Sequence, residues 1–271
     1  MSPSSHEGSL PSGLRRALVI VPTINEAGAI EEVIERLFPA VPEGVELLVV
    51  DDASGDGTPE IVQKLADRHP VHLIERPGKL GLGTAYVTGF TWGLENGFDA
   101  IVEMDGDLSH DPAQVPDLLG GLAQADLVVG SRYVKGGEIR NWGRFRRWLS
   151  AAGNLYARRW ALVPVMDSTS GFRAYRAEAL SAIRYETVGA EGYAFQIELT
   201  RRAHLAGCRI AEIPITFVER TSGSSKMSRR IVLEALMKVT GWGASQRLHR
   251  ILPRRRRVTT EVRPTDTSRR Q

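Results

Sequence analysis

The sequence is poor in cysteine, in long apolar runs and in sorting signals. Cys208 is the single cysteine of the 271 residues, and one cysteine cannot form an internal disulfide, which favours a reducing compartment. Uninterrupted apolar runs reach about six residues, whereas a membrane-spanning helix needs ~20. The N-terminus lacks the basic, apolar and small-residue regions of a signal peptide. We therefore expect a cytoplasmic chain without a membrane-spanning helix.

Basic charge is concentrated at one end of the chain. The formal net charge is +3, and the last 18 residues carry seven arginines against Glu261 and Asp266. Without this tail the chain is slightly acidic, so the folded part lacks the basic face that a nucleic-acid-binding protein presents. We predict no nucleic-acid partner, with RNA binding through the arginine tail as the alternative.

The first half of the chain alternates short apolar strands with amphipathic helices. Residues 1–14 are rich in Ser, Pro and Gly and predict a disordered arm. Strands are predicted at Ala17–Pro22, Glu46–Asp51, Val71–Glu75, Ala100–Met104 and Asp126–Ser131, and helices at Ala27–Phe38, Pro59–Arg68, Gly83–Asn96 and Pro112–Ala123. Strands that are apolar throughout are typical of a parallel sheet covered on both faces. The pattern predicts an α/β fold with a mostly parallel central sheet and helices on both faces.

The second half is less regular. It predicts helices at Arg144–Leu162, Tyr193–Ala206 and Ile231–Leu252, and strands at Phe172–Tyr175 and Arg209–Val218. We expect a catalytic domain over residues 15–228, an amphipathic C-terminal helix over 229–252 and a disordered basic tail over 253–271. The helix near 144–162 interleaves Trp148, Tyr156 and Trp160 with arginines, a pattern that suits a helix lying on an anionic membrane surface.

Two nucleotide-binding motifs are absent, and carboxylates stand in their place. The first strand lacks a following G-x-G-x-x-G, and no G-x-x-x-x-G-K-[ST] occurs. Asp51 and Asp52 follow the second strand instead, and Asp105 and Asp107 follow the fourth. Carboxyl ends of parallel strands line one crevice, and two close carboxylates repel unless a cation bridges them. The residues predict a Mg²⁺ or Mn²⁺ site, with a simple Asp-Gly turn as the alternative. His110, beside them, is interpreted as a packing residue.

Several ordered motifs between residues 17 and 240 resemble the inverting GT-A glycosyltransferases of family 2, and among them the dolichol-phosphate or polyprenol-phosphate mannose synthases. They are Val21-Pro22-Thr23-Ile24-Asn25-Glu26, Val49-Val50-Asp51-Asp52, Lys79-Leu80-Gly81-Leu82-Gly83-Thr84, Glu103-Met104-Asp105-Gly106-Asp107, Gly130-Ser131-Arg132-Tyr133, Asp167-Ser168-Thr169-Ser170-Gly171-Phe172-Arg173 and Arg220-Thr221-Ser222-Gly223-Ser224-Ser225-Lys226. The resemblance implies a GT-A fold. The sequence departs from the family at Ile24, where a tyrosine is usual, and at Gly106, where an alanine is usual.

The resemblance also implies roles for individual residues. The catalytic set is Asp105, Asp107 and Arg132. Asp105, Asp107 and Ser109 would bind the metal, and Arg132, Ser170 and Arg173 would bind the acceptor phosphate. The donor site would comprise Pro22, Ile24, Glu26, Val50, Asp52, Asp105, Gly106, Asp107, Arg132, Arg220 and Lys226.

The activity that the resemblance implies is transfer of mannose from GDP-mannose to a polyprenyl phosphate. The reaction would invert the sugar configuration and give polyprenyl-phosphate β-mannose and GDP. We expect a peripheral enzyme on the cytoplasmic face of the cell membrane, with a separate integral-membrane anchor protein as a possible partner. The alternatives are another donor on the same lipid, UDP-glucose or GDP-glucose, and a non-catalytic nucleotide-sugar-binding module.

Overall fold

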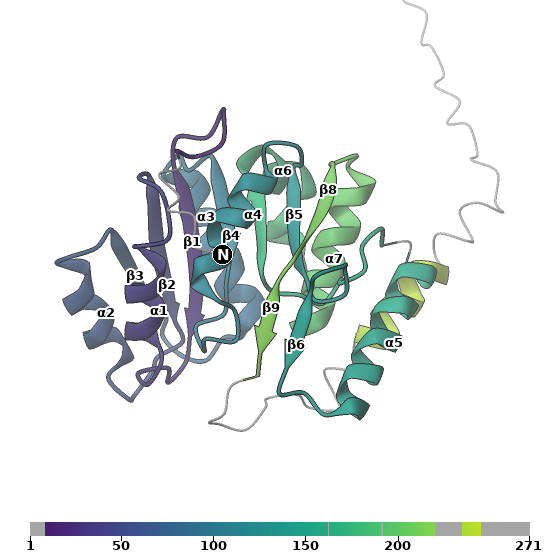
Figure 1. Ribbon diagram of the computed structural model, residues 1–271, viewed down its shortest axis with the longest axis horizontal. Helices are drawn as coiled ribbons and strands as arrows, with labels where there is room; N and C mark the ends of the chain where they lie inside the picture. The colour runs from purple at the N-terminus through teal and green to yellow at the C-terminus, as the bar shows by residue number, and fades with distance from the viewer. Residues whose placement is uncertain (1–8, 162, 191, 220–234, 245–271) are drawn as a thin grey trace, which may run out of the picture.

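A seven-stranded sheet forms the centre of the molecule (Figure 1). The computed structural model describes residues 9–161, 163–190, 192–219 and 235–244. In the sheet the strand order is β3-β2-β1-β4-β7-β5-β8, and a two-stranded sheet joins β6 to β9. β7 runs antiparallel to β4 and β5, and the other strand pairs are parallel. The strands are β1 (Ala17–Thr23), β2 (Val45–Asp51), β3 (Val71–Glu75), β4 (Ala100–Glu103), β5 (Leu127–Ser131), β6 (Glu138–Arg140), β7 (Arg173–Arg176), β8 (Ile210–Pro214) and β9 (Thr216–Val218).

Helices cover both faces of the large sheet and enclose two apolar cores. The helical elements are α1 (Ile30–Leu37), α2 (Thr58–Ala66), α3 (Leu82–Glu95), η1 (Pro112–Gln114), α4 (Val115–Gly121), α5 (Arg144–Trp160), α6 (Ala177–Ile183), η2 (Tyr185–Thr187) and α7 (Gly192–Leu205), and residues 235–244 are also helical. One core joins the sheet to α1, α2 and α4. The other joins it to α3, α6 and α7. The predicted α/β architecture is therefore confirmed.

The order of the strands creates the crevice in which ligands of such sheets bind. β1 pairs with β2 on one side and with β4 on the other. The chain therefore moves outward in opposite directions from β1, and the loops after β1 and β4 separate at this reversal point. Asp105 and Asp107 come directly after β4. The predicted carboxylates thus lie at the edge of the sheet that the topology opens.

Three local predictions differ from the structure. Residues 9–14 are not a free arm, because Leu14 is buried in the first core. The strand predicted at Arg209–Val218 is divided into β8 and β9, because the chain leaves the large sheet after Pro214 to pair with β6. β6 and α6 were not predicted; β6 has only three residues, too few to produce a visible alternation. Most of the helix predicted at Ile231–Leu252 and the whole basic tail lie outside the described residues.

Among the described helices, none combines the length and apolarity needed to cross a membrane.

Candidate active site

The Asp105 and Asp107 carboxylates occupy the loop after β4. The Ser109 amide donates to Asp107 Oδ1 at 3.1 Å, and the Tyr86 hydroxyl, from α3, donates to Asp105 Oδ1 at 3.5 Å. About a third of the Asp105 side chain is accessible, 34%. The protein around it nevertheless desolvates the carboxyl and raises its pKa. The charge of Asp107 adds to this rise, and the hydrogen bond from Tyr86 and the charge of Arg132 oppose it. Two neighbouring carboxylates of like charge favour a cation between them.

The side chains present fit a divalent cation that is completed by a ligand. Within the described part of the chain, no three His, Cys, Asp or Glu residues gather into a metal-binding group. Two neighbouring carboxylates are nonetheless the usual protein contribution to a Mg²⁺ site, in which phosphate oxygens and water complete the shell. Ser109 is buried, 4% exposed, and its clearest contribution is the amide that orients Asp107.

Gly106 is explained by packing against β1. A Cβ at this position would lie 2.9 Å from Val21 Cγ1 and 3.4 Å from the Pro22 carbonyl oxygen. The glycine therefore lets the loop that carries the two carboxylates lie against the end of β1.

His110 is a packing residue, as the sequence indicated. It is 2% exposed, stacks on Phe172 at a centroid distance of 4.9 Å and meets the edge of Phe217. Its Nδ1 accepts from the Asp105 amide at 3.2 Å, which places the proton of the neutral ring on Nε2. Burial lowers the pKa of His110, so the neutral ring is favoured and supports the loop.

The predicted donor residues at the ends of β1 and β2 do come together. Pro22 is the register partner of Val50, and the Asp52 amide donates to the Thr23 carbonyl at 2.9 Å. Pro22, Ile24 and Glu26 are partly exposed at this edge. The predictions for Val50 and Asp52 need correction. The Val50 side chain is fully buried in the second core, and the Asp52 carboxylate is already engaged by protein donors.

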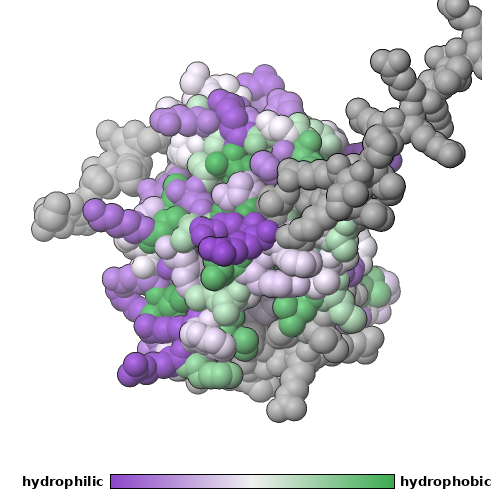
Figure 2. All heavy atoms as spheres, turned by 90° about the vertical axis from the view of Figure 1, so that its right-hand side faces the viewer, coloured by the Kyte–Doolittle hydropathy of each residue, from purple (hydrophilic) through white to green (hydrophobic). Residues whose placement is uncertain are grey.

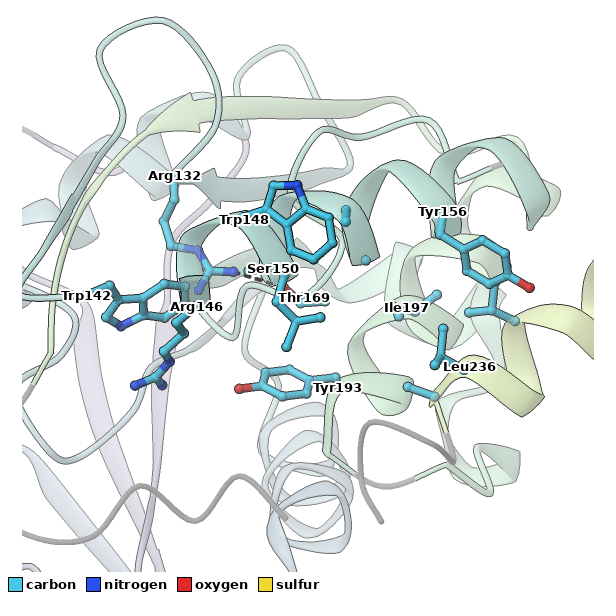
Figure 3. Close-up of a pocket in the computed structure, with 15 residues that line it drawn as sticks. Arg132, Trp142, Arg146, Trp148, Ser150, Tyr156, Thr169, Tyr193, Ile197 and Leu236 are labelled. Atoms are coloured by element: carbon cyan, nitrogen blue, oxygen red, sulfur yellow. Dashed lines mark hydrogen bonds between the residues drawn. The ribbon is translucent and has the colours of Figure 1, made fainter. Parts of the chain in front are cut away.

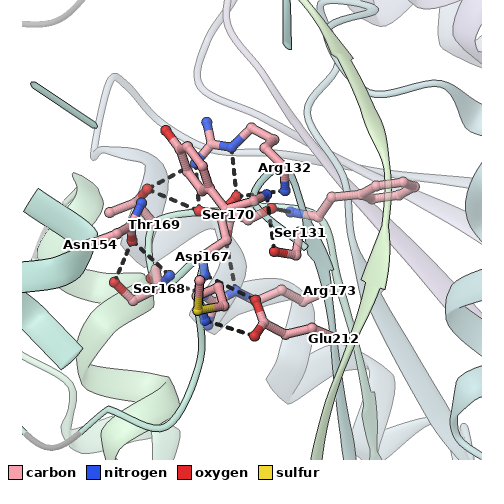
Figure 4. A network of polar contacts seen from close by, with 12 residues as sticks. Ser131, Arg132, Asn154, Asp167, Ser168, Thr169, Ser170, Arg173 and Glu212 are labelled. Carbon is pink, nitrogen blue, oxygen red and sulfur yellow. Dashed lines mark hydrogen bonds and ion pairs between the residues drawn. The ribbon is translucent and has the colours of Figure 1, made fainter. Parts of the chain in front are cut away.

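Arg132 and the loop at residues 166–170 form a dense polar network (Figure 4). Arg132 Nε and Nη2 donate to the two oxygens of Asp167, each at 2.7 Å, and Nη2 also donates to Thr169 Oγ1 at 2.9 Å. The Asp167 amide donates to Glu212 at 2.9 Å. From α5, Asn154 Oδ1 accepts from the Ser168 amide and hydroxyl, both at 2.8 Å. The network fixes the guanidinium of Arg132 rigidly.

The acceptor-phosphate role predicted for Arg173 and Ser170 is wrong in this geometry. Arg173 is fully buried. Its guanidinium donates to the carbonyl oxygens of Ser170, Gln196 and Ser168 and to the Thr200 hydroxyl, at 2.6 to 2.9 Å. Its charge also opposes the rise that burial gives to the pKa of Glu103, which reaches about 8. Ser170 is 2% exposed. Both residues hold the loop in place and do not face a ligand.

An apolar pocket with one cationic end lies beside this network (Figure 3). Its volume is about 340 Å³. Arg132, Trp142 and Arg146 gather at one end, and Tyr156 and Leu236 lie at the other. The remaining lining residues are Trp148, Leu149, Ser150, Ala152, Gly153, Thr169, Tyr193, Ile197, Ala235 and Val239. The pocket therefore suits an amphiphile with an anionic head.

The head end of the pocket offers hydrogen-bond donors that sequence reasoning missed. Arg146 Nε and Trp142 Nε1 are buried, and neither has an acceptor among the described residues. The Arg146 guanidinium lies 4.3 Å from the Trp142 ring centroid. The sequence did contain a signal, because Arg146 and Ser150 belong to the amphipathic helix that was predicted to face a membrane. A basic residue on such a helix can equally line its inner side.

The pocket and the carboxylates are neighbours. A Cβ on Gly171 would lie 3.6 Å from Asp105 Oδ1, and Gly171 follows directly on the loop that binds Arg132. The structure thus brings Asp105, Asp107 and Arg132 into one site. The remaining two predicted donor-site residues, Arg220 and Lys226, lie outside the described residues.

Residues 18–184 match the family described as glycosyl transferase family 2. The chain is 49% identical to an undecaprenyl-phosphate mannosyltransferase from Micrococcus luteus, over 86% of this chain and 96% of the relative. It is 47% identical to a polyprenol monophosphomannose synthase from Mycolicibacterium smegmatis, over 87% and 90%. A dolichol-phosphate mannosyltransferase from Pyrococcus furiosus is 34% identical, over 82% of this chain and 62% of the relative.

Solved glycosyltransferase structures share the fold. Glucosyl-3-phosphoglycerate synthase from Mycobacterium tuberculosis, in complex with Mn²⁺, UDP-glucose and phosphoglyceric acid, superposes with a TM-score of 0.62 at 26% identity, over 84% of this chain and 80% of that one. The complex of the same enzyme with Mg²⁺ and UDP gives a TM-score of 0.63 at 26% identity, over the same shares of the two chains.

Proposed function

This chain belongs to glycosyl transferase family 2, and from that premise we propose that it transfers mannose from GDP-mannose to a polyprenyl phosphate, giving polyprenyl-phosphate β-mannose and GDP. The observation that carries the proposal is the proximity of a two-carboxylate loop to an apolar pocket with a cationic end, both next to the loop at residues 166–171. The first suits the diphosphate of a nucleotide sugar, and the second suits a lipid phosphate. The relatives with 49% and 47% identity, named for mannosyl transfer to polyprenyl phosphates, support the same reaction.

The residues fit a division of labour between donor and acceptor. A Mg²⁺ or Mn²⁺ ion held by Asp105 and Asp107 would offset the negative charge that grows on the departing nucleoside diphosphate. The structural neighbours that bind Mn²⁺ or Mg²⁺ support this choice of cation. Arg132 and Arg146 bind and orient the acceptor phosphate, because guanidinium groups match phosphate oxygens in charge and geometry.

A phosphate acceptor changes what the chain must supply. The acceptor oxygen is already ionised at neutral pH, so attack on the anomeric carbon needs positioning and charge neutralisation more than a strong base. The rigid Arg132 serves this purpose, since Asp167 and Thr169 fix its guanidinium before the lipid binds. The neutral, buried His110 has no proton-transfer step to perform.

We also propose that α5 lies on the cytoplasmic face of the cell membrane. Figure 2 looks onto this side of the molecule, where hydrophobic and hydrophilic residues are interspersed. Phe145, Trp148 and Leu155 on α5 are 73%, 65% and 46% exposed, and Met237 beside it is 61% exposed. Arginines accompany them on α5. An exposed apolar stripe with arginines suits an interface helix on anionic lipid. A separate integral-membrane protein would then serve as an additional anchor, and full activity with membrane recovery of the purified chain alone would count against it.

Transfer of glucose from UDP-glucose is the second candidate. It is favoured by the structural likeness to a synthase that was solved with UDP-glucose. GDP-glucose as donor to the same lipid would share every feature of the acceptor pocket. The structural features above do not depend on the sugar, so the donor is the part of the proposal that needs its own test.

A partition assay separates these candidates. The purified chain is incubated with Mn²⁺ or Mg²⁺, a short polyprenyl phosphate in detergent and radiolabelled GDP-mannose, GDP-glucose or UDP-glucose. We expect label from GDP-mannose to enter the organic phase and to disappear with EDTA or in Asp107→Asn. Label from a glucose donor would keep the site and replace the donor. Unchanged transfer by Asp107→Asn would overturn the catalytic role of the carboxylate pair.

A further inference from the structure

A polar side chain, Asn154, is buried in the middle of α5. Asn154 and Ala157 are the buried residues of this 17-residue helix, and Asn154 is 4% exposed. Asparagine disfavours the interior of a helix, because its side chain competes for backbone hydrogen bonds. Burial of its amide also costs free energy unless the amide is hydrogen-bonded. Asn154 is therefore expected to make a contact that compensates for both costs.

That contact is to the loop at residues 166–170. Asn154 Oδ1 accepts from the amide and from the hydroxyl of Ser168, both at 2.8 Å. Ser168 is itself fully buried. Asn154 Nδ2 is buried as well and has no acceptor among the described residues. The oxygen of the side chain thus makes the contact, and it ties α5 to the loop.

The loop has a second anchor, which comes from the large sheet. Glu212, on β8, accepts from the amide of Asp167 at 2.9 Å and from the amide of the preceding residue at 2.7 Å. Next to these two anchors, Asp167 and Thr169 accept the hydrogen bonds of Arg132 (Figure 4). Arg132 follows β5, which pairs with β8. The anchor at Glu212 therefore joins the loop to the sheet that carries Arg132, and the anchor on α5 joins it to a separate helix.

The same helix carries the second arginine of the pocket. Arg146, Ser150 and Asn154 are spaced four residues apart, so they lie on one side of α5. Arg132 and Arg146 gather at one end of the pocket (Figure 3), and their guanidinium groups lie 5.4 and 4.3 Å from the ring centroid of Trp142. One arginine is held by the sheet and the other by α5. The distance between the two guanidinium groups therefore depends on how α5 is held against the loop.

We propose that Asn154 is a positioning residue for the acceptor phosphate, and that its contact with Ser168 sets the spacing between Arg132 and Arg146. The inference rests on the proposed lipid-phosphate acceptor. Asn154 does not line the pocket, so it acts through the residues that do. Groups that bind one ligand from two elements must be held to within ~0.5 Å, and buried hydrogen bonds behind them provide this precision.

Two substitutions of Asn154 separate its oxygen from its nitrogen. Asn154→Leu keeps a similar shape and removes the acceptor, and we expect kcat/KM for the polyprenyl phosphate to fall at least about tenfold, because misplacement by ~1 Å can cost more than this. Asn154→Asp keeps an acceptor oxygen and loses only Nδ2, so kcat/KM should stay within about threefold of wild type.

The donor side should not respond to either substitution. α5 contributes none of the residues predicted to bind the donor, which follow β1, β2 and β4 or lie beyond β9. The KM for GDP-mannose and the affinity for GDP should therefore stay within about twofold of wild type. A residue that only stabilised the fold would not separate acceptor from donor in this way.

Ser168→Ala tests whether the effect passes through Ser168. It removes the hydroxyl and leaves the amide bonded to Asn154, so acceptor kcat/KM should fall by about threefold, the scale of one neutral hydrogen bond. Added to Asn154→Leu, it should have no further effect, because the hydroxyl has already lost its partner. Multiplied losses in the double variant would overturn the route through Ser168.

The measurement is steady-state transfer by the full chain with Mg²⁺, radiolabelled GDP-mannose and a short polyprenyl phosphate in detergent. Each substrate is varied in turn, calorimetric titration gives the affinity for GDP, and thermal unfolding shows that each variant is folded. Asn96→Ala is the matched control, because Asn96 is exposed at the end of α3 and its side chain donates only to the Trp92 carbonyl, at 2.8 Å.

Unchanged acceptor kinetics in a folded Asn154→Leu variant would overturn the inference, and so would equal losses for donor and acceptor. An Asn154→Asp variant that melts like wild type but is as impaired as Asn154→Leu would assign the effect to Nδ2 and overturn the role of the Ser168 contact. Failure of the proposed function gives a different result. A wild-type chain that transfers no sugar to the lipid from any of the donors would overturn that function, and this inference with it.

Discussion

Arg132 and Asp167 form a buried, bidentate ion pair. Nε and Nη2 of Arg132 each donate to a different carboxylate oxygen of Asp167, at a distance of 2.7 Å. Asp167 also accepts from the Arg132 amide at 3.0 Å. Neither charge has water to stabilise it, since the side chains are 5% and 0% exposed. Each residue is therefore stable in its charged form only while the other is present.

Loss of the Asp167 charge should destabilise the fold. Asp167→Asn leaves the Arg132 guanidinium buried without a counter-charge, and we expect the free energy of unfolding to fall by roughly 3 kcal/mol or more. Urea denaturation at neutral pH measures the difference. Glu138→Gln is the control, because its partner Arg140 is exposed and a surface pair contributes little. A variant as stable as wild type would show that water or another group compensates Arg132.

The contribution of this pair should depend on pH in a defined direction. Burial raises the pKa of Asp167, but the charge and hydrogen bonds of Arg132 outweigh it, so the pKa lies below the usual value. An acid with a lowered folded-state pKa stabilises the fold above its unfolded pKa, about 4, and loses this effect as the pH falls through the folded value. Urea denaturation between neutral pH and about pH 3 should therefore show wild type losing its advantage over Asp167→Asn. A constant gap would contradict the assignment.

The position of the two carboxylates could be predicted from the sequence, because it depends only on where the strands end. Apolar strands identified β1, β2 and β4 within a residue or two at each end. The carboxyl ends of parallel strands share one edge, so Asp105 and Asp107 were placed correctly at the crevice. The sequence did not predict that the last strand is divided into β8 and β9. β9 has only three residues, and it lies outside the large sheet because it pairs with β6.

The residues that line the acceptor pocket could not be predicted in the same way, because long-range packing decides which arginine side chains are buried in the protein. Arg173 and Arg132 are both arginines near loop motifs, and the sequence does not distinguish them. The structure places Arg173 on β7, between β4 and β5, where backbone carbonyls surround it. Arg146 belongs to the helix that the sequence predicts to lie on a membrane, yet it lines the pocket. The spacing of apolar and polar residues predicts that a segment is helical, but it does not show which side of the helix faces the interior.

Substitution of Arg146 should impair use of the acceptor more than use of the donor. Arg146→Ala removes a partly buried cation, paired with Glu219, from the head end of the pocket, and we expect kcat/KM for the polyprenyl phosphate to fall by at least about tenfold, one charged hydrogen bond being worth roughly 1.5–3 kcal/mol. The KM for GDP-mannose should change little. Arg140→Ala, at an exposed pair on β6, is the control. Equal losses for donor and acceptor would place Arg146 between the two substrates or in a purely structural role.

Removal of one carboxylate of the metal-binding loop should reduce activity and raise stability. Asp107→Asn removes a negative charge beside Asp105, whose own pKa is raised partly by Asp107. Without added metal we expect a melting temperature equal to or above that of wild type, because the repulsion is relieved. Transfer should fall by about a hundredfold or more, the scale found when one electrostatic stabiliser of a transition state is lost. A lower melting temperature in EDTA would mean that Asp107 is a structural residue.

The exposed aromatic residues of α5 should matter for membrane binding and not for folding. Phe145 and Trp148 contact each other at a centroid distance of 6.1 Å and are 73% and 65% exposed. Phe145→Ser with Trp148→Ser removes a large apolar area from the surface, and water already covers most of it in solution. We expect an unchanged melting temperature. We also expect at least tenfold weaker binding in sedimentation with vesicles that contain anionic lipid, since a loss of about 1.4 kcal/mol of insertion energy lowers the affinity tenfold.

Leu205→Ser is the matched control, because Leu205 is 58% exposed at the end of α7 and outside α5. High salt should weaken binding of the double variant further if arginines supply the remaining attraction. Equal binding of wild type and both variants would remove α5 from the membrane contact and leave its apolar stripe as a surface for another protein.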